Sequence, residues 1–163
     1  MRKLLFSLLL PLFTLIPACS PQAAENAPAT AATQAAVHPV SGLEVIPLTI
    51  TTEGKAHAFK VEVARTPQQQ AQGLMFRTAM GPDEGMLFPY DQPHLLSFWM
   101  KNTVLSLDLV FIDEQRRIVN IAETATPYSE ASILSAAPGV AVLELNGGRT
   151  RALGIVAGNK VEW

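Results

Sequence analysis

From residue 44 onward, the hydrophobic positions come in short runs that favour β-strands over long helices. Residues 45–51 and 57–64 form two such runs, rich in β-branched side chains, and Glu53-Gly54-Lys55 between them is typical of a turn. Glu114-Gln115-Arg116 indicates a second hairpin further along the chain. The other strands that the pattern predicts lie at 85–90, 97–102, 107–113, 117–123, 140–145 and 160–163.

Two short helices are predicted between these strands. The stretch Thr66-Pro67-Gln68-Gln69 has a capping threonine, a proline at the first helical position and a glutamine three residues after the cap. Gly73 is expected to end this helix after about two turns. Asn146 can cap a second short helix over 149–153, which Gly154 would close.

The order of these elements predicts one domain at residues 44–163. Residues 124–139 are polar and alanine-rich, which indicates a long loop with a helical turn at 129–136. The fold class is therefore α+β and dominated by strands, with a mostly antiparallel sheet or a partial barrel and two short helices. A domain of about 120 residues buries enough apolar surface to fold without a disulfide or a metal.

Residues 1–19 are typical of an export signal. Arg2 and Lys3 precede an apolar run at 4–16, which is too short and too interrupted for a membrane-spanning helix. The chain's one cysteine ends this segment in Leu15-Ile16-Pro17-Ala18-Cys19-Ser20. This stretch resembles the lipobox of bacterial lipoproteins, whose mature chain begins with a lipid-modified cysteine. The alternative is ordinary cleavage, with Cys19 discarded or left as a tail thiol.

Residues 20–43 predict a flexible spacer. They are alanine-rich, contain several prolines and lack helical periodicity, leucine-rich runs and aromatic residues, so they bury too little surface to order themselves. His38 lies in this range and is expected to be inert. We therefore expect a periplasmic protein that Cys19 anchors to a lipid membrane, with the inner or outer membrane left open.

The charge pattern argues against a nucleic-acid partner. From Glu44 onward, ten lysines and arginines stand against thirteen aspartates and glutamates, a net charge of −3, and no basic face is evident. The domain has no cysteine, which excludes disulfides, thiolate catalysis and cysteine-rich metal sites there. We find no serine-hydrolase, zinc-protease or phosphate-loop motif. No catalytic residue, metal site or cofactor is predicted, and the sequence leaves open whether the protein is an enzyme.

Two carboxylates stand out because they fall inside strands that are apolar on both faces. Asp108 shares a face with Val110 and Ile112, and Glu144 shares a face with Val140 and Val142. An isolated buried carboxylate is too costly to leave ionised and unpaired. Asp108 and Glu144 are therefore the leading candidates for polar chemistry in the domain.

The expected partners of these carboxylates are Arg77 and Lys101, with Asn102 beside them. One interpretation is internal ion pairing that fixes the strand register. The other is a polar pocket in an apolar wall, where these side chains converge on a small zwitterionic or anionic ligand. Glu62, on the same strand face as Lys60, is expected to lie on a solvated face.

Several motifs, in order and at characteristic spacing, resemble the domain of unknown function 192 family. They are Gly73-Leu74-Met75-Phe76-Arg77, Met80, Gly85-Met86-Leu87-Phe88, Phe98-Trp99-Met100-Lys101-Asn102-Thr103, Leu107-Asp108 and Leu143-Glu144-Leu145-Asn146. The resemblance covers 59–161, and it implies a compact β-rich single domain without implying an activity. Ser106 stands where the family pattern usually has proline.

The leading hypothesis is a non-catalytic ligand-binding or accessory domain of the envelope, with an unknown small ligand or envelope partner. Its pocket would contain Arg77, Lys101, Asn102, Asp108 and Glu144. One alternative is an envelope hydrolase that uses Asp108 and Glu144 as a carboxylate pair. Another is a periplasmic copper carrier, because four methionines lie between Met75 and Met100, close to His94. Methionine also fills apolar cores, so these sulfurs have a structural explanation.

Overall fold

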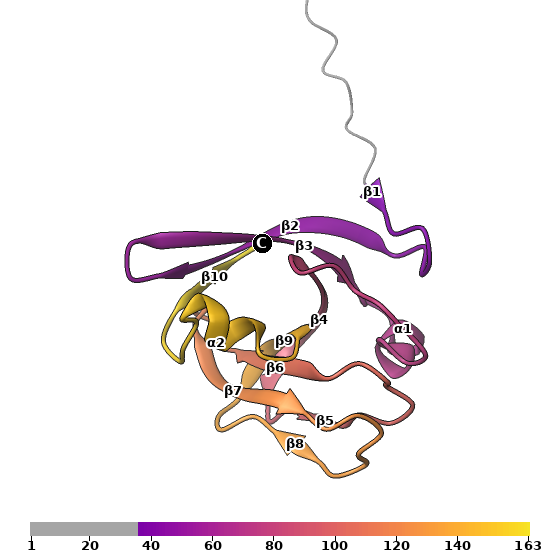
Figure 1. Cartoon of the computed structure of the whole chain (residues 1–163). Coiled ribbons are helices and arrows are strands. Elements are labelled where there is room, and N and C mark those ends of the chain that lie inside the picture. The colour runs from indigo at the N-terminus through magenta and orange to yellow at the C-terminus, as the bar shows by residue number, and fades with distance from the viewer. Residues whose placement is uncertain (1–35) are drawn as a thin grey trace, which may run out of the picture. The chain divides into compact units, whose positions relative to one another are not determined.

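The computed structural model describes residues 36–163 of the chain. Over this range it has ten strands and two short helices, which confirms the strand-dominated α+β fold (Figure 1). The strands are β1 (Ala36–Val37), β2 (Glu44–Thr52), β3 (Lys55–Val63), β4 (Glu84–His94), β5 (Ser97–Phe98), β6 (Leu107–Ile112), β7 (Ile118–Ala125), β8 (Ile133–Leu134), β9 (Gly139–Asn146) and β10 (Lys160–Glu162). The helices are α1 (Pro67–Gln72) and α2 (Arg149–Leu153).

The main sheet runs in the order β1-β2-β3-β4-β9-β6-β7, and β10 pairs with residues 49–51 of β2, beyond the two residues that pair with β1. Every pair in it is antiparallel except β3 and β4, which α1 and its flanking loops connect as parallel neighbours. A single bridge from Arg117 to Lys160 joins β10 to the chain just before β7. This bridge is not a ladder, so the sheet curls without closing into a barrel.

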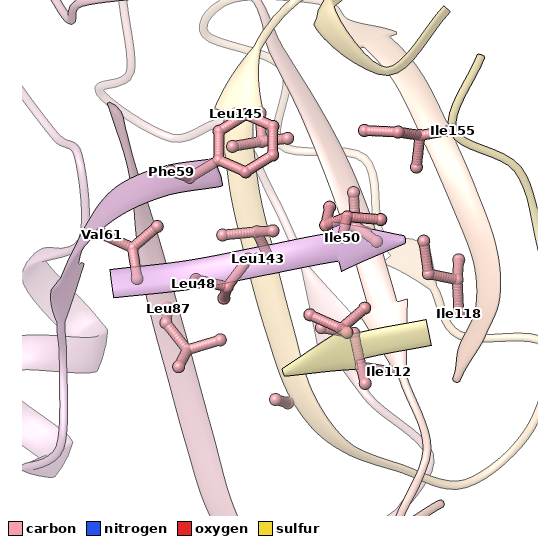
Figure 2. Close-up of a cluster of buried hydrophobic side chains, with 13 residues drawn as sticks. Leu48, Ile50, Phe59, Val61, Leu87, Ile112, Ile118, Leu143, Leu145 and Ile155 are labelled. Carbon is pink, nitrogen blue, oxygen red and sulfur yellow. The ribbon is translucent and has the colours of Figure 1, made fainter. Parts of the chain in front are cut away.

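Two apolar clusters form the core, one on each face of the central strands β4, β9 and β6. The first cluster includes Leu48, Ile50, Leu87, Ile112 and Leu143, which converge in Figure 2. The second cluster lies on the opposite face and consists of Ala64, Leu74, Met86, Phe88, Leu96, Met100, Leu107, Leu109, Phe111, Ala125 and Val142. Each fully buried side chain of this size stabilises the fold by about 1.5–3 kcal/mol. The central strands are therefore buried on both faces, as their continuous apolar runs predict.

The local signals for helices are confirmed in part. Thr66 and Gln69 form the reciprocal capping box of α1, and Gly73 ends that helix. In α2, however, the N-cap residue is Gly148 rather than Asn146, and its φ of 80° is one that glycine adopts without strain. Asn146 instead donates its amide to the backbone oxygens of Met80 and Gly81.

Two segments near the second cluster differ from their predicted structure. The strand expected at 97–102 continues only over β5, after which the chain turns at 101–102. The helical turn expected at 129–136 is instead the short strand β8, which pairs with β5.

The folded domain extends back to Ala36, eight residues before the predicted boundary. β1 pairs with the start of β2, and His38 and Leu43 share a backbone hydrogen bond of 2.8 Å. The predicted signal segment, Cys19 and most of the predicted spacer lie outside the described residues. In the part of the chain that the structure describes, no helix is long and apolar enough to cross a membrane.

Candidate functional site

Asp108 and Glu144 lie on adjacent strands but on opposite faces of the sheet. β6 and β9 are antiparallel, with Asp108 opposite Leu145 and Leu109 opposite Glu144. Residues directly opposite each other project to the same face, and the next residue along projects to the other. Asp108 therefore projects with Leu145 toward the first cluster, whereas Glu144 projects with Leu109 toward the second. The two carboxyl groups do not form a pair.

Asp108 is fully buried, and both of its carboxylate oxygens accept hydrogen bonds from the fold. Its Oδ1 accepts hydrogen bonds from the backbone N–H groups of Thr124 and Gly148, both at 2.8 Å. Its Oδ2 accepts from the backbone N–H of Thr150 at 2.9 Å and from the Thr150 hydroxyl at 2.7 Å. Gly148 and Thr150 belong to the first turn of α2, where backbone N–H groups lack helical partners. The carboxylate of Asp108 thus caps α2 from a neighbouring strand.

Glu144 is buried to the same degree, with 4% of the residue exposed, but has no comparable partners. Within the described residues, no donor reaches its Oε2 atom. Burial raises the pKa of the Glu144 carboxyl from 4.5 to about 8, because the ionised form loses its hydration there. At pH 7 the group is therefore predominantly a neutral acid, able to donate a hydrogen bond.

Glu144 lines a cavity of about 130 Å³, the Glu144 pocket, between the end of α1, β4 and the chain that follows β5. Its walls combine aromatic, apolar and polar groups. The lining residues are Gln70, Ala71, Gln72, Gly73, Leu74, Met75, Phe88, Tyr90, Ser97, Phe98, Trp99, Lys101, Thr103 and Glu144. Aromatic side chains, convergent polar groups and a perturbed pKa within one cavity indicate a candidate small-ligand site.

Tyr90 and Lys101 are the other titratable residues of the Glu144 pocket. Burial, with a smaller contribution from the charge of Glu144, raises the pKa of the Tyr90 hydroxyl above its ordinary value of 10.0. The ammonium of Lys101 lies 5.0 Å from the centroid of the Trp99 ring, in cation–π geometry. Trp99 itself is 48% exposed. The pocket therefore carries an aromatic residue and a cation on its lining.

The loops around the Glu144 pocket hold unusual backbone conformations. Phe76, Asn102 and Tyr128 have φ values of 62°, 52° and 61°, a region that non-glycine residues rarely adopt. These loops are joined by backbone hydrogen bonds, from Phe76 N–H to Asn102 O at 2.9 Å and from Tyr128 N–H to Thr103 O at 3.1 Å. Residues held in such conformations are commonly found at ligand sites.

The five predicted site residues thus separate into three places. Glu144 and Lys101 line the same pocket, and Asn102 lies next to it, with its amide 3.8 Å from the Met75 sulfur. Asp108 caps α2 on the other face of the sheet. Arg77 belongs to a different polar cluster.

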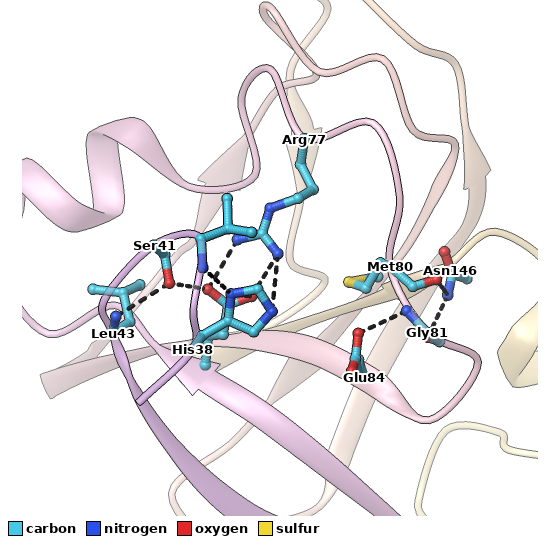
Figure 3. Close-up of polar contacts among 10 residues, drawn as sticks. His38, Ser41, Leu43, Arg77, Met80, Gly81, Glu84 and Asn146 are labelled. Carbon is cyan, nitrogen blue, oxygen red and sulfur yellow. Dashed lines mark hydrogen bonds and ion pairs between the residues drawn. The ribbon is translucent and has the colours of Figure 1, made fainter. Parts of the chain in front are cut away.

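That cluster is centred on Glu62, which the sequence wrongly placed on a solvated face. Only 3% of Glu62 is exposed, and Arg77 binds both of its oxygens, at 2.9 and 3.0 Å. Ser41 donates to Glu62, and His38 Nδ1 lies 3.6 Å from Glu62 Oε1 (Figure 3). Residues 38–41 therefore cover this end of β3. Arg77 also borders a second cavity of about 670 Å³, but its charge is already paired.

The methionines give little geometric support for a copper site. Met86 and Met100 are fully buried in the second cluster, as filler of an apolar core would be. His94 is exposed and packs edge-on against Tyr90. Across residues 36–163, no group of three or more histidine, cysteine, aspartate or glutamate side chains is placed to hold a metal ion.

Comparison with known proteins identifies a family whose description names no activity. The model of the family DUF192, described as "Uncharacterized ACR", matches residues 48–163. A protein of unknown function from Novosphingobium aromaticivorans DSM 12444, known from a crystal structure, shares 51% sequence identity with this chain and superposes with a TM-score of 0.78. The match covers 81% of this chain and 94% of that one. A proposed transcription regulator from Sinorhizobium meliloti 1021 is 41% identical, with a TM-score of 0.72, over 74% of this chain and 94% of that one. No curated protein matches.

Proposed function

This chain belongs to the DUF192 family, and we propose that it is an exported envelope protein whose domain binds a small ligand without chemical conversion. The proposed site is the Glu144 pocket. One observation carries the proposal: a fully buried carboxyl whose Oε2 has no partner among the described residues lines a cavity of about 130 Å³.

The energetics of Glu144 favour a ligand over a purely structural role. An unsatisfied buried polar group costs about 1–3 kcal/mol, so native proteins rarely retain one without a reason. Asp108 shows that the same sheet can satisfy a buried carboxylate completely. A ligand atom that accepts a hydrogen bond from the protonated Glu144 carboxyl would reduce this cost on binding.

The size and walls of the pocket suit a small molecule with an apolar body. An engineered apolar cavity of about 150 Å³ holds a benzene molecule, which sets the scale. Phe88 and Phe98 meet edge to face, with ring centroids 5.1 Å apart, and both line the pocket. Trp99 is more exposed and can cover a bound ligand from the solvent side.

A fragment screen by NMR tests this proposal. The full-length chain, labelled with ¹⁵N, would be mixed with neutral, anionic and cationic fragments of about the size of a benzene ring. We expect the perturbed amides to gather at the end of α1 and at β5, and Trp99→Ala to weaken binding. Val156→Ala is the control, because Val156 is exposed but lines neither cavity. Perturbations confined to the cavity beside Arg77, or none at all, would contradict the proposal.

The paired-carboxylate hydrolase gains no support from the geometry. Asp108 lies on the far face of the sheet, and Glu144 is the one carboxyl group in the lining of its pocket. A glycosidase of the usual two-carboxylate type needs both groups on the same substrate bond. Binding therefore remains the better account of this site.

Location in the envelope is part of the proposal and rests on residues 1–19 of the sequence. The apolar run after Arg2 and Lys3, ending at Cys19, supports export and lipid anchoring. Cys19→Ala should move the protein from the membrane fraction to the soluble periplasmic fraction. Unchanged membrane association of the variant would refute lipid anchoring, and a soluble wild-type protein would favour ordinary cleavage.

A further inference from the structure

The Glu144 pocket has an uneven charge, which bears on the class of its ligand. Its titratable lining residues are Glu144 of β9, Tyr90 of β4 and Lys101 of the chain after β5. Burial raises the pKa values of the Glu144 carboxyl and the Tyr90 hydroxyl, so that both groups are mainly neutral at pH 7. The ammonium of Lys101 is then the one full charge in the lining.

This positive charge has no carboxylate partner in the described part of the chain. Among residues 36–163, Lys101 takes part in no salt bridge, and its ammonium contacts the Trp99 ring instead. Arg77, by contrast, has a carboxylate partner at 2.9 Å. The pocket therefore presents a cation at Lys101 and a buried carboxyl group with an unpartnered oxygen at Glu144.

Resting on the proposed function, we propose that the Glu144 pocket binds a small organic anion, a monocarboxylate with an apolar body. In this arrangement, one carboxylate oxygen of the ligand accepts a hydrogen bond from the protonated carboxyl of Glu144. Lys101 neutralises the ligand's charge, and the apolar body contacts Phe88 and Phe98. Hydrogen bonds to an ionised acceptor are about twice as strong as neutral ones, so an anion gains most from this donor.

The other ligand charges fit the pocket less well. A cationic ligand would be repelled by Lys101, and it would require Glu144 to ionise where burial opposes the charge. A neutral ligand could accept a hydrogen bond from Glu144, but it would leave the charge of Lys101 without a partner. The three classes differ only in charge, so isosteric probes can separate them.

Benzoate, benzamide and benzylammonium form such a series, with one ring and three charges. Each would be titrated into the ¹⁵N-labelled full-length chain at pH 6, with Kd read from the chemical shifts of pocket residues. We expect benzoate to bind about tenfold more tightly than benzamide, and benzylammonium to bind more weakly than either. Tightest binding by benzylammonium or by benzamide would overturn the anion proposal.

Variants assign the effect to the two groups. Lys101→Met should weaken benzoate about tenfold more than it weakens benzamide, whereas Lys60→Met, at an exposed lysine of β3, should change neither. Binding of benzoate by the wild type should weaken about tenfold from pH 6 to pH 9, as Glu144 loses its proton. Glu144→Gln should give the same Kd at both pH values, while Glu114→Gln, at an exposed residue, should keep the wild-type dependence.

The failure of this inference is distinguishable from failure of the proposed function. If the tightest pocket ligands of the fragment screen are neutral or cationic, or if Lys101→Met weakens benzoate and benzamide equally, the anion proposal is wrong and the binding site stands. If benzoate does not bind and no fragment perturbs the pocket, both proposals are wrong.

Discussion

Asp108 and Glu144 are one residue out of register on adjacent strands, and almost equally buried, yet they are in opposite situations. Both oxygens of Asp108 accept two hydrogen bonds each, from the backbone and hydroxyl groups of three residues. Glu144 has an oxygen without a partner, a raised pKa and a cavity beside it. Burial alone therefore does not identify a ligand site. The number of hydrogen bonds that the fold supplies separates a structural carboxylate from a candidate ligand group.

Asp108→Asn should give the largest effect. In asparagine, an NH₂ group replaces one carboxylate oxygen and faces two of the groups that now donate hydrogen bonds to it. Buried N–H groups in the first turn of α2 would then be unpaired. We expect a loss of about 3–5 kcal/mol in the free energy of unfolding. Urea denaturation at pH 7 would measure it. A loss below about 1 kcal/mol would show that α2 does not depend on Asp108.

Arg77→Met tests a third buried carboxylate, which the fold satisfies by an ion pair. Removing the guanidinium leaves Glu62 buried, with Ser41 and His38 as its remaining contacts. We expect a loss of about 3 kcal/mol. Arg65→Met is the control, because Arg65 and its partner Glu44 are more exposed and surface pairs contribute little. Equal losses in the two variants would show that the buried Arg77–Glu62 pair contributes no more to stability than the exposed Arg65–Glu44 pair.

Thr150→Val isolates one of the four hydrogen bonds to Asp108. Valine keeps the shape of the side chain but removes the hydroxyl that donates at 2.7 Å. The backbone N–H of residue 150 still donates, so we expect a smaller loss of about 1 kcal/mol, measured by the same denaturation. A loss as large as that of Asp108→Asn would mean that the hydroxyl, rather than the backbone donors, carries most of the stabilisation.

Glu144→Gln should have the smallest effect below pH 4.5, within about 1 kcal/mol, because a neutral amide there replaces a carboxyl that is mostly neutral in both the folded and the unfolded chain. Its pH dependence has a definite sign. The carboxyl ionises near 4.5 in the unfolded chain and near 8 in the folded one, so the folded state retains a proton across this window. The stability of the wild type relative to the variant should therefore fall as pH rises from 4.5 to 8. A rise over that range would contradict the assignment.

Much of the fold could be predicted from the sequence because its signals are local. Alternation correctly placed Asp108 on the face of Val110 and Ile112, and Glu144 on the face of Val142. The capping box of α1 was readable for the same reason. What alternation cannot give is the pairing register between two distant strands. That register decides whether Asp108 and Glu144 share a face, and they do not.

The candidate site was predicted only in part because its contacts are long-range. Glu62 looked solvated beside Lys60, since the residues that cover it, such as Ser41 and Arg77, come from other parts of the chain. The cap of α2 comes from Asp108, forty residues before Gly148. Lys101 and Glu144 were both expected in a pocket and do line the same one. No local pattern could have shown which carboxylate the fold would leave unsatisfied.

Glu144 should remain a neutral, unpartnered acid in the pocket, whereas both carboxylate oxygens of Asp108 are hydrogen-bonded within the fold. A ¹³C NMR titration of the glutamate side-chain carboxyl carbons, with Glu144→Gln to assign the signal, tests this most directly. The carboxyl carbon of Glu144 should titrate with a midpoint near 8, and a pocket ligand should shift this midpoint. A midpoint near the ordinary value of 4.5, unchanged by ligand, would contradict this expectation.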